Sequence, residues 1–219
     1  MNEWPPFQSI LADLSIPTGY QLAQIRAEDV REVIALMERW YPDVTVGAES
    51  CHLREGFYLE KVQLREVSER RSVYGIIIKR GSEIVGLGTF ERDDDAKFIF
   101  GHLGAIAPEH RGSGLASTCT EACERMARAI GAELMIWTAT LKHPYSQRMA
   151  EAAGYELAGI IPGFDRDMIE PGLVKRVYEA VYVKLLVPEA ALKKPSRQAM
   201  TPKVRELFTH LFTPTAASD

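Results

Sequence analysis

Residues 98–116 read Phe-Ile-Phe-Gly-His-Leu-Gly-Ala-Ile-Ala-Pro-Glu-His-Arg-Gly-Ser-Gly-Leu-Ala, and this stretch decides the fold. Its apolar first half predicts a strand that ends near Ala107, and a turn at Pro108 leads into a helix over about 114–130. Residues 132–140 predict a further strand. A crossover of this length makes the two strands parallel and places the helix on one face of the sheet.

The glycine-rich turn between this strand and this helix has the features of an anion site. Gly112 and Gly114 have no Cβ, so a ligand can approach the main chain closely. The first amides of a helix have no intrahelical partner, and the helix dipole favours negative charge there. A phosphate or pyrophosphate satisfies both conditions, with Arg111 as an added contact or as a solvated side chain. The spacing matches neither a P-loop nor a dinucleotide fingerprint.

At these residues the chain resembles the GNAT superfamily of acyl-CoA N-acyltransferases. The resemblance lies in the apolar strand Leu103–Ala107, in Pro108-Glu-His and in Arg111-x-x-Gly114-x-Ala116, and it continues to a helix that ends at Gly154-Tyr155. It is strong over about 96–156 and weaker over about 20–186. It implies a three-layer α/β fold whose mixed, mostly antiparallel central sheet contains one splayed parallel strand pair. The alternative is another α/β domain with a glycine-rich turn.

The pattern divides the chain into three parts. Residues 1–18 contain Trp4-Pro-Pro and Pro17 and predict an extended arm, either packed or loose. Residues 19–187 form the acyltransferase domain. Residues 188–219 form an extension with one amphipathic helix, which begins at Thr201-Pro202 and carries Val204, Leu207, Phe208, Leu211 and Phe212 on one face. This face must dock on the body or on a second chain, which would give a homodimer.

Within the domain, the expected elements follow in chain order. A strand over 20–25 and a helix over 27–40 are followed by an irregular helical region over 48–67, which the resemblance makes a wall of the acceptor site. Strands over 72–79 and 83–91 form a hairpin around Arg80-Gly81-Ser82. Two last strands, over 155–161 and 174–186, pair around a loop over 162–173. In that loop Phe164, Asp165 and Asp167 are candidate acceptor contacts.

Composition excludes several classes of function. The 219 residues suffice for one domain with a substantial core, and no apolar run is long enough to span a bilayer. The N-terminus lacks a signal-peptide pattern, so we expect a cytoplasmic protein without membrane contact. A net charge of −4 argues against nucleic-acid binding. We expect no metal: Cys119 and Cys123 are interpreted as small core residues, and Asp93–Asp95 as a solvated turn.

The resemblance implies acetyl-CoA as co-substrate, with its pantetheine arm in the gap beside the central strand. Gly101 and Gly104 suit a bulge or a close approach there. The implied cofactor contacts are Leu103, Gly104, Ala105, Ile106, Ala107, Arg111, Gly112, Ser113, Gly114, Leu115, Ala116, His143 and Ser146. His143 has a second interpretation as no more than the start of a helix.

The reaction needs a base, because an alkyl amine is mostly protonated at neutral pH. His102, on the central strand, is the candidate, with a hydrogen-bonded core histidine as the alternative interpretation. Glu91 and Asp165 are other candidates for the base. Many family members have a tyrosine acid four residues before the closing glycine of the helix, where this chain has Ala150. Tyr145 lies about 140° around that helix from Ala150 and does not simply replace it.

These observations favour an N-acetyltransferase that transfers the acetyl group of acetyl-CoA to a primary amine of a small molecule or peptide by direct attack. The missing tyrosine keeps a second class open, a non-catalytic acyl-CoA-binding regulatory module. A longer acyl donor or an oxygen acceptor also stays open. The sequence does not identify the acceptor.

Overall fold

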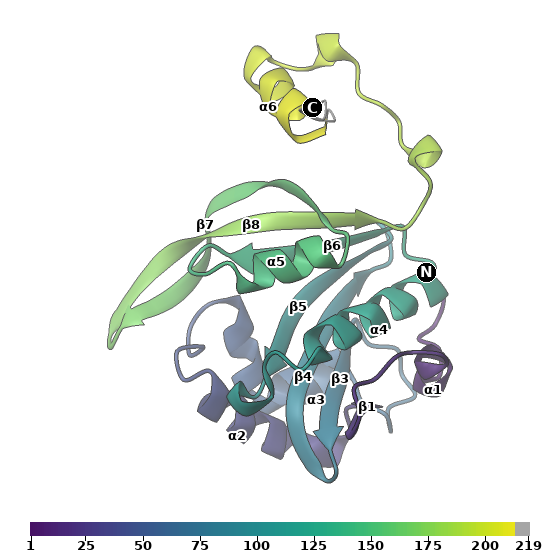
Figure 1. Cartoon of the computed structure of the whole chain (residues 1–219), viewed down its shortest axis with the longest axis vertical. Coiled ribbons are helices and arrows are strands. Elements are labelled where there is room, and N and C mark those ends of the chain that lie inside the picture. Colours follow the sequence, from purple (N-terminus) through teal and green to yellow (C-terminus); the bar gives the residue numbers. More distant parts are fainter. Residues whose placement is uncertain (213–219) are drawn as a thin grey trace.

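The computed structural model describes residues 1–212, and its centre is a mixed eight-stranded sheet (Figure 1). The strand order is β1-β3-β4-β5-β6-β8-β7, with β2 beside β3. The pairs β5–β6 and β2–β3 are parallel and the others antiparallel, which confirms the predicted fold class. The strands are β1 (Tyr20–Gln24), β2 (Val62–Gln63), β3 (Val73–Arg80), β4 (Glu83–Asp93), β5 (Phe98–Ile106), β6 (Leu134–Thr140), β7 (Glu156–Glu170) and β8 (Leu173–Leu185).

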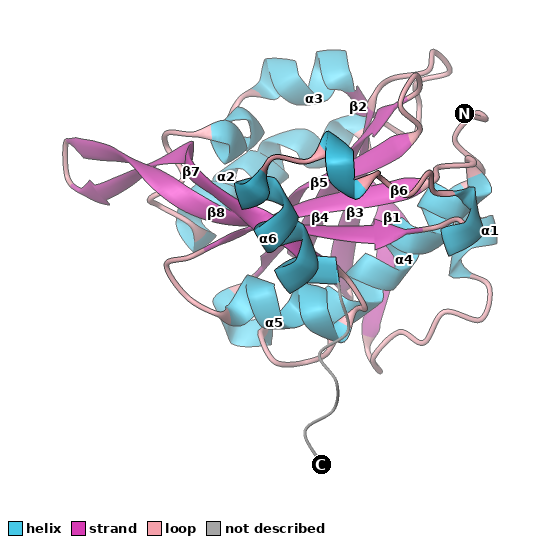
Figure 2. Ribbon diagram, turned by 90° about the horizontal axis from the view of Figure 1, so that it is seen from above, coloured by secondary structure: helices cyan, strands magenta, loops and turns pink. Residues whose placement is uncertain are grey.

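Helices cover both faces of the sheet and complete the three layers (Figure 2). One face carries α1 (Phe7–Leu11), α4 (Leu115–Ala129) and α5 (Tyr145–Ala152). The other carries η1 (Ala27–Asp29), α2 (Val30–Trp40), η2 (Ala48–Leu53) and α3 (Glu55–Lys61). Short 3-10 turns complete the path: η3 (Pro108–His110), η4 (Glu189–Ala191) and η5 (Arg197–Ala199).

The core consists of two apolar clusters, one on each face of the sheet. Tyr74 and Ile76 of β3 pack on the α1 and α4 side, whereas Ile77 packs on the α2 and α3 side. Because both faces are covered, β3 has the continuous apolar sequence Ile76-Ile77-Ile78 in place of an alternating pattern.

The N-terminal arm packs across the body, and it is not simply extended as predicted. Its short helix α1 buries Phe7 and Ile10 against the sheet. The indole of Trp4 donates a hydrogen bond to the carbonyl of Arg71 at 2.8 Å, and the Arg92 guanidinium lies 4.8 Å above the Trp4 ring. The arm is therefore part of the first apolar cluster.

The hairpin of β7 and β8 corrects the prediction of a loop over 162–173. Both strands continue through that stretch to a tight turn at Pro171-Gly172, and the hairpin projects beyond the rest of the sheet (Figure 1). The register shifts between Ile161 and Asp165, so Pro162-Gly163-Phe164 forms a bulge. Pro162 is tolerated because β7 is an edge strand, where a missing amide breaks no inner ladder.

The predicted C-terminal helix is present as α6 (Pro202–Phe212), but its apolar face is not buried within one chain. Val204, Leu207, Phe208 and Phe212 are exposed. The helix contacts β7 of the same chain, but no residue of α6 is buried by this contact. The last residues of the predicted extension, 213–219, lie outside the described residues.

Among the helices of residues 1–212, none is both long enough and apolar enough to cross a membrane.

We predict that the arm contributes to global stability. Phe7→Ala should lower the free energy of unfolding by about 3 kcal/mol, because it empties a buried aromatic site. Gln8→Ala, on the exposed side of the same helix, is the control and should change it by less than about 0.5 kcal/mol. Urea denaturation followed by circular dichroism measures both. Equal stability of the two variants would show that the arm does not belong to the cooperative core.

Candidate functional site

The site begins where the two parallel central strands part. β5 and β6 pair from Phe98↔Leu134 to Gly101↔Trp137, and beyond that point β5 pairs with β4 alone and β6 with β8 alone. The register between β4 and β5 shifts at the same place, so that His102 is an extra residue on β5. A bulge increases local twist and bends its strand, which turns β5 away from β6.

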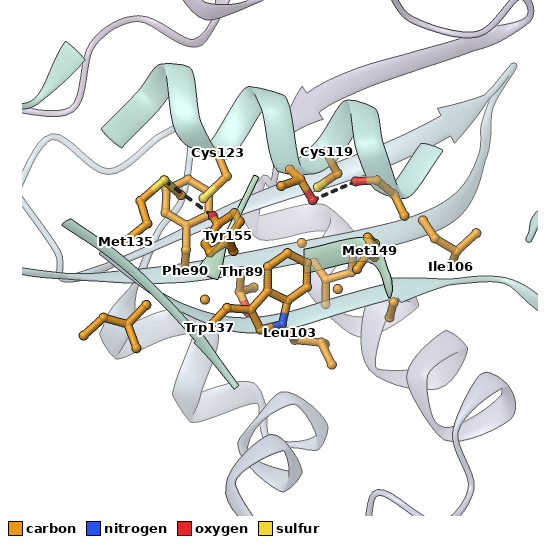
Figure 3. Close-up of a pocket in the computed structure, with 18 residues that line it drawn as sticks. Thr89, Phe90, Leu103, Ile106, Cys119, Cys123, Met135, Trp137, Met149 and Tyr155 are labelled. Atoms are coloured by element: carbon orange, nitrogen blue, oxygen red, sulfur yellow. Dashed lines mark hydrogen bonds between the residues drawn. The ribbon is translucent and has the colours of Figure 1, made fainter. Parts of the chain in front are cut away.

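The parted strands and α4 enclose an apolar cavity (Figure 3). Its empty volume is about 620 Å³, including its open mouth. The predicted contacts Leu103, Gly104, Ala105 and Ile106 line it on the β5 side. Helix α4 contributes a stripe at helical spacing. The rest of the lining comes from β4, β6, α5 and the residue before β7, and includes Phe90, Met135, Ile136, Trp137, Met149 and Tyr155, with Phe90, Met135 and Tyr155 gathered at one end (Figure 3).

The α4 stripe consists of Ala116, Cys119, Thr120 and Cys123. Burial raises the pKa of both thiols, that of Cys119 to about 12, so both stay protonated at neutral pH. The cysteines therefore act here as small apolar lining groups. Their i, i+3, i+4, i+7 spacing from Ala116 was a signal in the sequence that the prediction did not use.

The glycine turn lies at the start of α4, beside the end of β5. Gly112 and Gly114 have φ of +78° and +85°, and a Cβ on Gly112 would meet nothing within 4 Å. Within residues 1–212, the amides from Gly112 to Ser117 donate no hydrogen bond to the protein. The Arg111 guanidinium lies 5.2 Å from the centre of the Tyr41 ring. The turn is thus an open cradle of donors, which fits a pyrophosphate.

The start of α5 carries two predicted cofactor residues in different environments. His143 is exposed beside Tyr145, with 5.1 Å between the ring centres. The Ser146 hydroxyl is buried without a hydrogen-bond partner among the described residues, one helical turn before the cavity residue Met149. Tyr145 is 72% exposed and does not line the cavity, and Ala150 is fully buried. An unsatisfied hydroxyl close to the cavity fits a polar ligand group there.

The opposite face of the sheet holds the predicted base. His102 Nε2 lies 2.8 Å from Glu91 Oε2, and Ser72 Oγ donates to Glu91 Oε1 at 2.7 Å. The His102 hydrogen bond, together with that from Ser72, lowers the pKa of Glu91. Glu91 is therefore a carboxylate that only accepts hydrogen bonds at neutral pH.

A second histidine, which the prediction missed, lies close by in η2. His52 is fully buried between Thr89 Oγ1 at 2.7 Å from Nε2 and the Glu49 carbonyl at 2.9 Å from Nδ1. Burial lowers its pKa to about 4, so it is neutral and joins η2 to the sheet.

Three carboxyl groups from distant parts of the chain meet on this same face, and we call Glu49, Asp165 and Glu179 the acidic group. The amide of Ala48 donates to Asp165 Oδ1 at 2.8 Å, which joins η2 to β7. Burial, with hydrogen bonding and repulsion from Asp165, raises the pKa of Glu49 to about 8. Burial, then repulsion from Asp165, raises that of Glu179 to about 7.

The other two predicted acceptor residues lie nearby on β7. Asp167 forms an ion pair with Lys142, and the Phe164 ring is partly exposed in the bulge. Glu49 and Glu179 were not predicted, because Glu49 is separated from Asp165 by more than a hundred residues and a lone glutamate gives no local signal.

A comparison with family models matches residues 33–155 to the acetyltransferase (GNAT) family, and the chain belongs to this family. It is therefore an acetyltransferase by class. No curated protein sequence matched the chain.

Solved structures of acetyltransferases share the fold. The ribosomal-protein-S18-alanine N-acetyltransferase from Escherichia coli aligns with a TM-score of 0.59 at 9% identity, over 80% of this chain and 99% of that chain. Arabidopsis thaliana NAA60, in complex with a bisubstrate analogue, aligns with a TM-score of 0.58 at 10% identity, over 76% and 97%. A chimera of the spermidine N-acetyltransferase SpeG from Vibrio cholerae and hSSAT gives 0.57 at 14%, over 77% and 96%.

We predict that the acidic group makes stability fall as pH rises. The pKa of Glu179 in the folded state is about 7, whereas an unfolded glutamate ionises near its ordinary pKa of 4.5. The folded state therefore binds more protons between these values, and the free energy of unfolding decreases with rising pH. Glu179→Gln should flatten this slope between about pH 4.5 and about pH 7, as measured by urea denaturation.

Glu156→Gln, on the exposed start of β7, is the control for loss of one carboxyl group and should keep the wild-type slope. A wild-type slope in Glu179→Gln would show that Glu179 is ionised throughout this range.

Proposed function

We propose that the chain transfers the acetyl group of acetyl-CoA to a primary amine of a small molecule or peptide. The observation that carries this proposal is the cavity along the open edge of β5. Its lining runs from Ala116, close to the donor-rich turn at Gly112–Gly114, to Gly101 and Leu103 on either side of the bulge at His102. Family membership and acetyltransferases of the same fold support it.

In this proposal, acetyl-CoA supplies an activated acyl group on a thioester. The amides from Gly112 to Ser117 would hold its pyrophosphate, with Arg111 beside them. The edge of β5 from Leu103 to Ala105 that no longer pairs with β6 would bind the pantetheine amides, much as an added strand would. The buried Ser146 hydroxyl, which has no hydrogen-bond partner among the described residues, would bond to the pantetheine arm, and His143 would lie at the mouth of the cavity.

The acceptor would approach on the α2 and α3 side of the sheet. The acidic group, with Asp167 and Phe164, suits an alkylammonium chain, because carboxyl groups offer it charge and the aromatic ring offers apolar contact. Spermidine and an alanine of ribosomal protein S18 are the acceptors named for enzymes of the same fold, which supports an amine without selecting one.

His102 would accept the proton of the amine, since it follows directly on the last pair between β5 and β6. We assign no acid role to Tyr145, because its ring is exposed and lies outside the cavity. The apolar end of the cavity at Phe90, Met135 and Tyr155 also suits an acyl group longer than acetyl, so donors of increasing chain length belong in the assay.

The test is release of the CoA thiol from acetyl-CoA with a panel of polyamines, amino acids, aminoglycosides and peptides. Gly114→Glu should raise the Kd of acetyl-CoA by about tenfold or more, because it places a carboxylate where phosphate would bind. Isothermal titration calorimetry measures the Kd, and thiol release should fall in parallel.

Gly114→Ala is the matched control, because it carries the same strain at positive φ without the charge, and it should bind acetyl-CoA more tightly than Gly114→Glu. Equal affinity of wild type and Gly114→Glu would remove the turn from the proposed site. Binding of acetyl-CoA without thiol release for any amine would favour the non-catalytic binding module.

We also propose a homodimer through α6. Its four exposed apolar side chains would contribute roughly 1.5–3 kcal/mol each if a second chain buried them. Removing the residues after Pro188, or replacing Leu207 and Phe208 together by Glu, should convert dimers to monomers in light scattering. Lys203→Glu, on the same helix, is the control and should stay dimeric. A monomeric wild-type protein would contradict the dimer.

A further inference from the structure

We propose that Glu91 and Ser72 are positioning residues for His102, and that the chain Ser72–Glu91–His102 holds the imidazole with its lone pair on Nδ1. This rests on the proposed function, in which His102 accepts a proton from the amine. Glu91 and Ser72 themselves touch neither substrate, so their effect passes through His102.

The sheet register brings the three groups together. Glu91 of β4 pairs with Phe100 of β5, so His102, two residues further along, is its diagonal neighbour on the same face. Ser72 directly precedes β3, the strand on the other side of β4, and reaches the same carboxylate. Three neighbouring strands thus fix one imidazole at the edge of the gap.

Each carboxylate oxygen of Glu91 has its own donor. Ser72 Oγ donates to Oε1 at 2.7 Å, and Oε2 lies 2.8 Å from His102 Nε2. Because an ionised carboxylate only accepts, Nε2 must carry the proton of the neutral imidazole. Nδ1 then holds the lone pair, and within residues 1–212 it has no hydrogen-bond partner.

The surroundings leave Nδ1 open to a substrate. The His102 side chain is 22% exposed, and the Phe100 ring packs edge-on against it at 5.3 Å. The titratable and charged groups around His102 are Glu91 from β4, Lys61 from α3 and the neutral His52 from η2. Of these, only the Glu91 carboxylate among the described residues bonds the imidazole.

In the proposed reaction, His102 Nδ1 accepts a proton from the protonated amine. An N–H bond of the protonated amine breaks, its electron pair stays on nitrogen, and a new N–H bond forms at His102 Nδ1. The freed pair attacks the thioester carbonyl carbon, and the C–S bond breaks with its electrons on the CoA sulfur. The nitrogen then loses its second proton to that thiolate, which leaves the neutral amide and the CoA thiol. The resulting imidazolium lies against the Glu91 carboxylate, which stabilises it, as the third group of a catalytic triad does.

The kinetic test uses thiol release with acetyl-CoA and the amine of the panel that gives the fastest turnover. Glu91→Gln should lower kcat by about 10–100-fold, the usual cost of losing an orienting partner. It should also move the acidic limb of the pH–rate profile to lower pH, because the imidazolium loses its facing carboxylate. Ser72→Ala should have a smaller effect in the same direction. Glu83→Gln, at the exposed start of β4, is the control and should match wild type.

Two further results decide between positioning and direct catalysis. In a His102→Ala background, Glu91→Gln should cost less than about threefold, because the partner through which it acts is gone. If Glu91→Gln lowers kcat in that background by as large a factor as in the wild type, Glu91 is itself the base, and the proposal is overturned. An acidic limb of the pH–rate profile that stays at the wild-type pH in Glu91→Gln would also overturn the proposal.

A measurement without turnover separates this proposal from the proposed function. Long-range ¹H–¹⁵N correlation spectra of histidine-labelled protein at about pH 8 report which nitrogen carries the proton. We expect His102 to be protonated at Nε2 in the wild type and to lose this preference in Glu91→Ala. Protonation at Nδ1 would overturn the proposal even in an active acetyltransferase. Protonation at Nε2 without acetylation of any amine would contradict the proposed function alone.

Discussion

The parting of β5 from β6 after Gly101 and Trp137 is the constraint on which the site depends. Main-chain donors and acceptors inside a protein are almost always paired, yet beyond this point β5 has a partner strand on one side only. The open edge must be satisfied by water or by a ligand that carries its own amides. The bulge at His102 turns the strand away from its neighbour, and the cavity follows from that turn.

Strand alternation then divides the chemistry between the two faces of the sheet. On β4, Phe90 faces the cavity and α4, whereas Thr89 and Glu91 on either side of it face η2 and α3. The cavity side is lined by thiols and apolar rings, while the other side carries carboxyl groups and the histidines His52 and His102. One sheet can therefore hold a long, mostly uncharged arm on one side and present a charged acceptor to it from the other.

Much of this could be predicted from the sequence, because its signals are local. The glycine turn before α4, the hairpin at Arg80-Gly81-Ser82 and the helix after Pro144 each depend on residues within one turn of each other. The rest depends on contacts between distant residues. Ala48 and Asp165 are 117 residues apart, and the Pro162-Gly163-Phe164 bulge resembles a loop until β8 pairs across it. Arm residues such as Phe7 become a helix only because the sheet buries them.

The acidic group links acceptor binding to protons. With pKa values raised to about 8 for Glu49 and about 7 for Glu179, these carboxyl groups are partly protonated at neutral pH when no cation faces them. An arriving ammonium group would favour their ionised forms, so its binding would release protons and strengthen as pH rises. In the proposed function, rising pH would therefore act on acceptor affinity through Glu49 and Glu179. This effect would appear in KM, because these two groups would bind the acceptor, whereas a change at His102 would appear in kcat, because His102 would accept the proton of the amine.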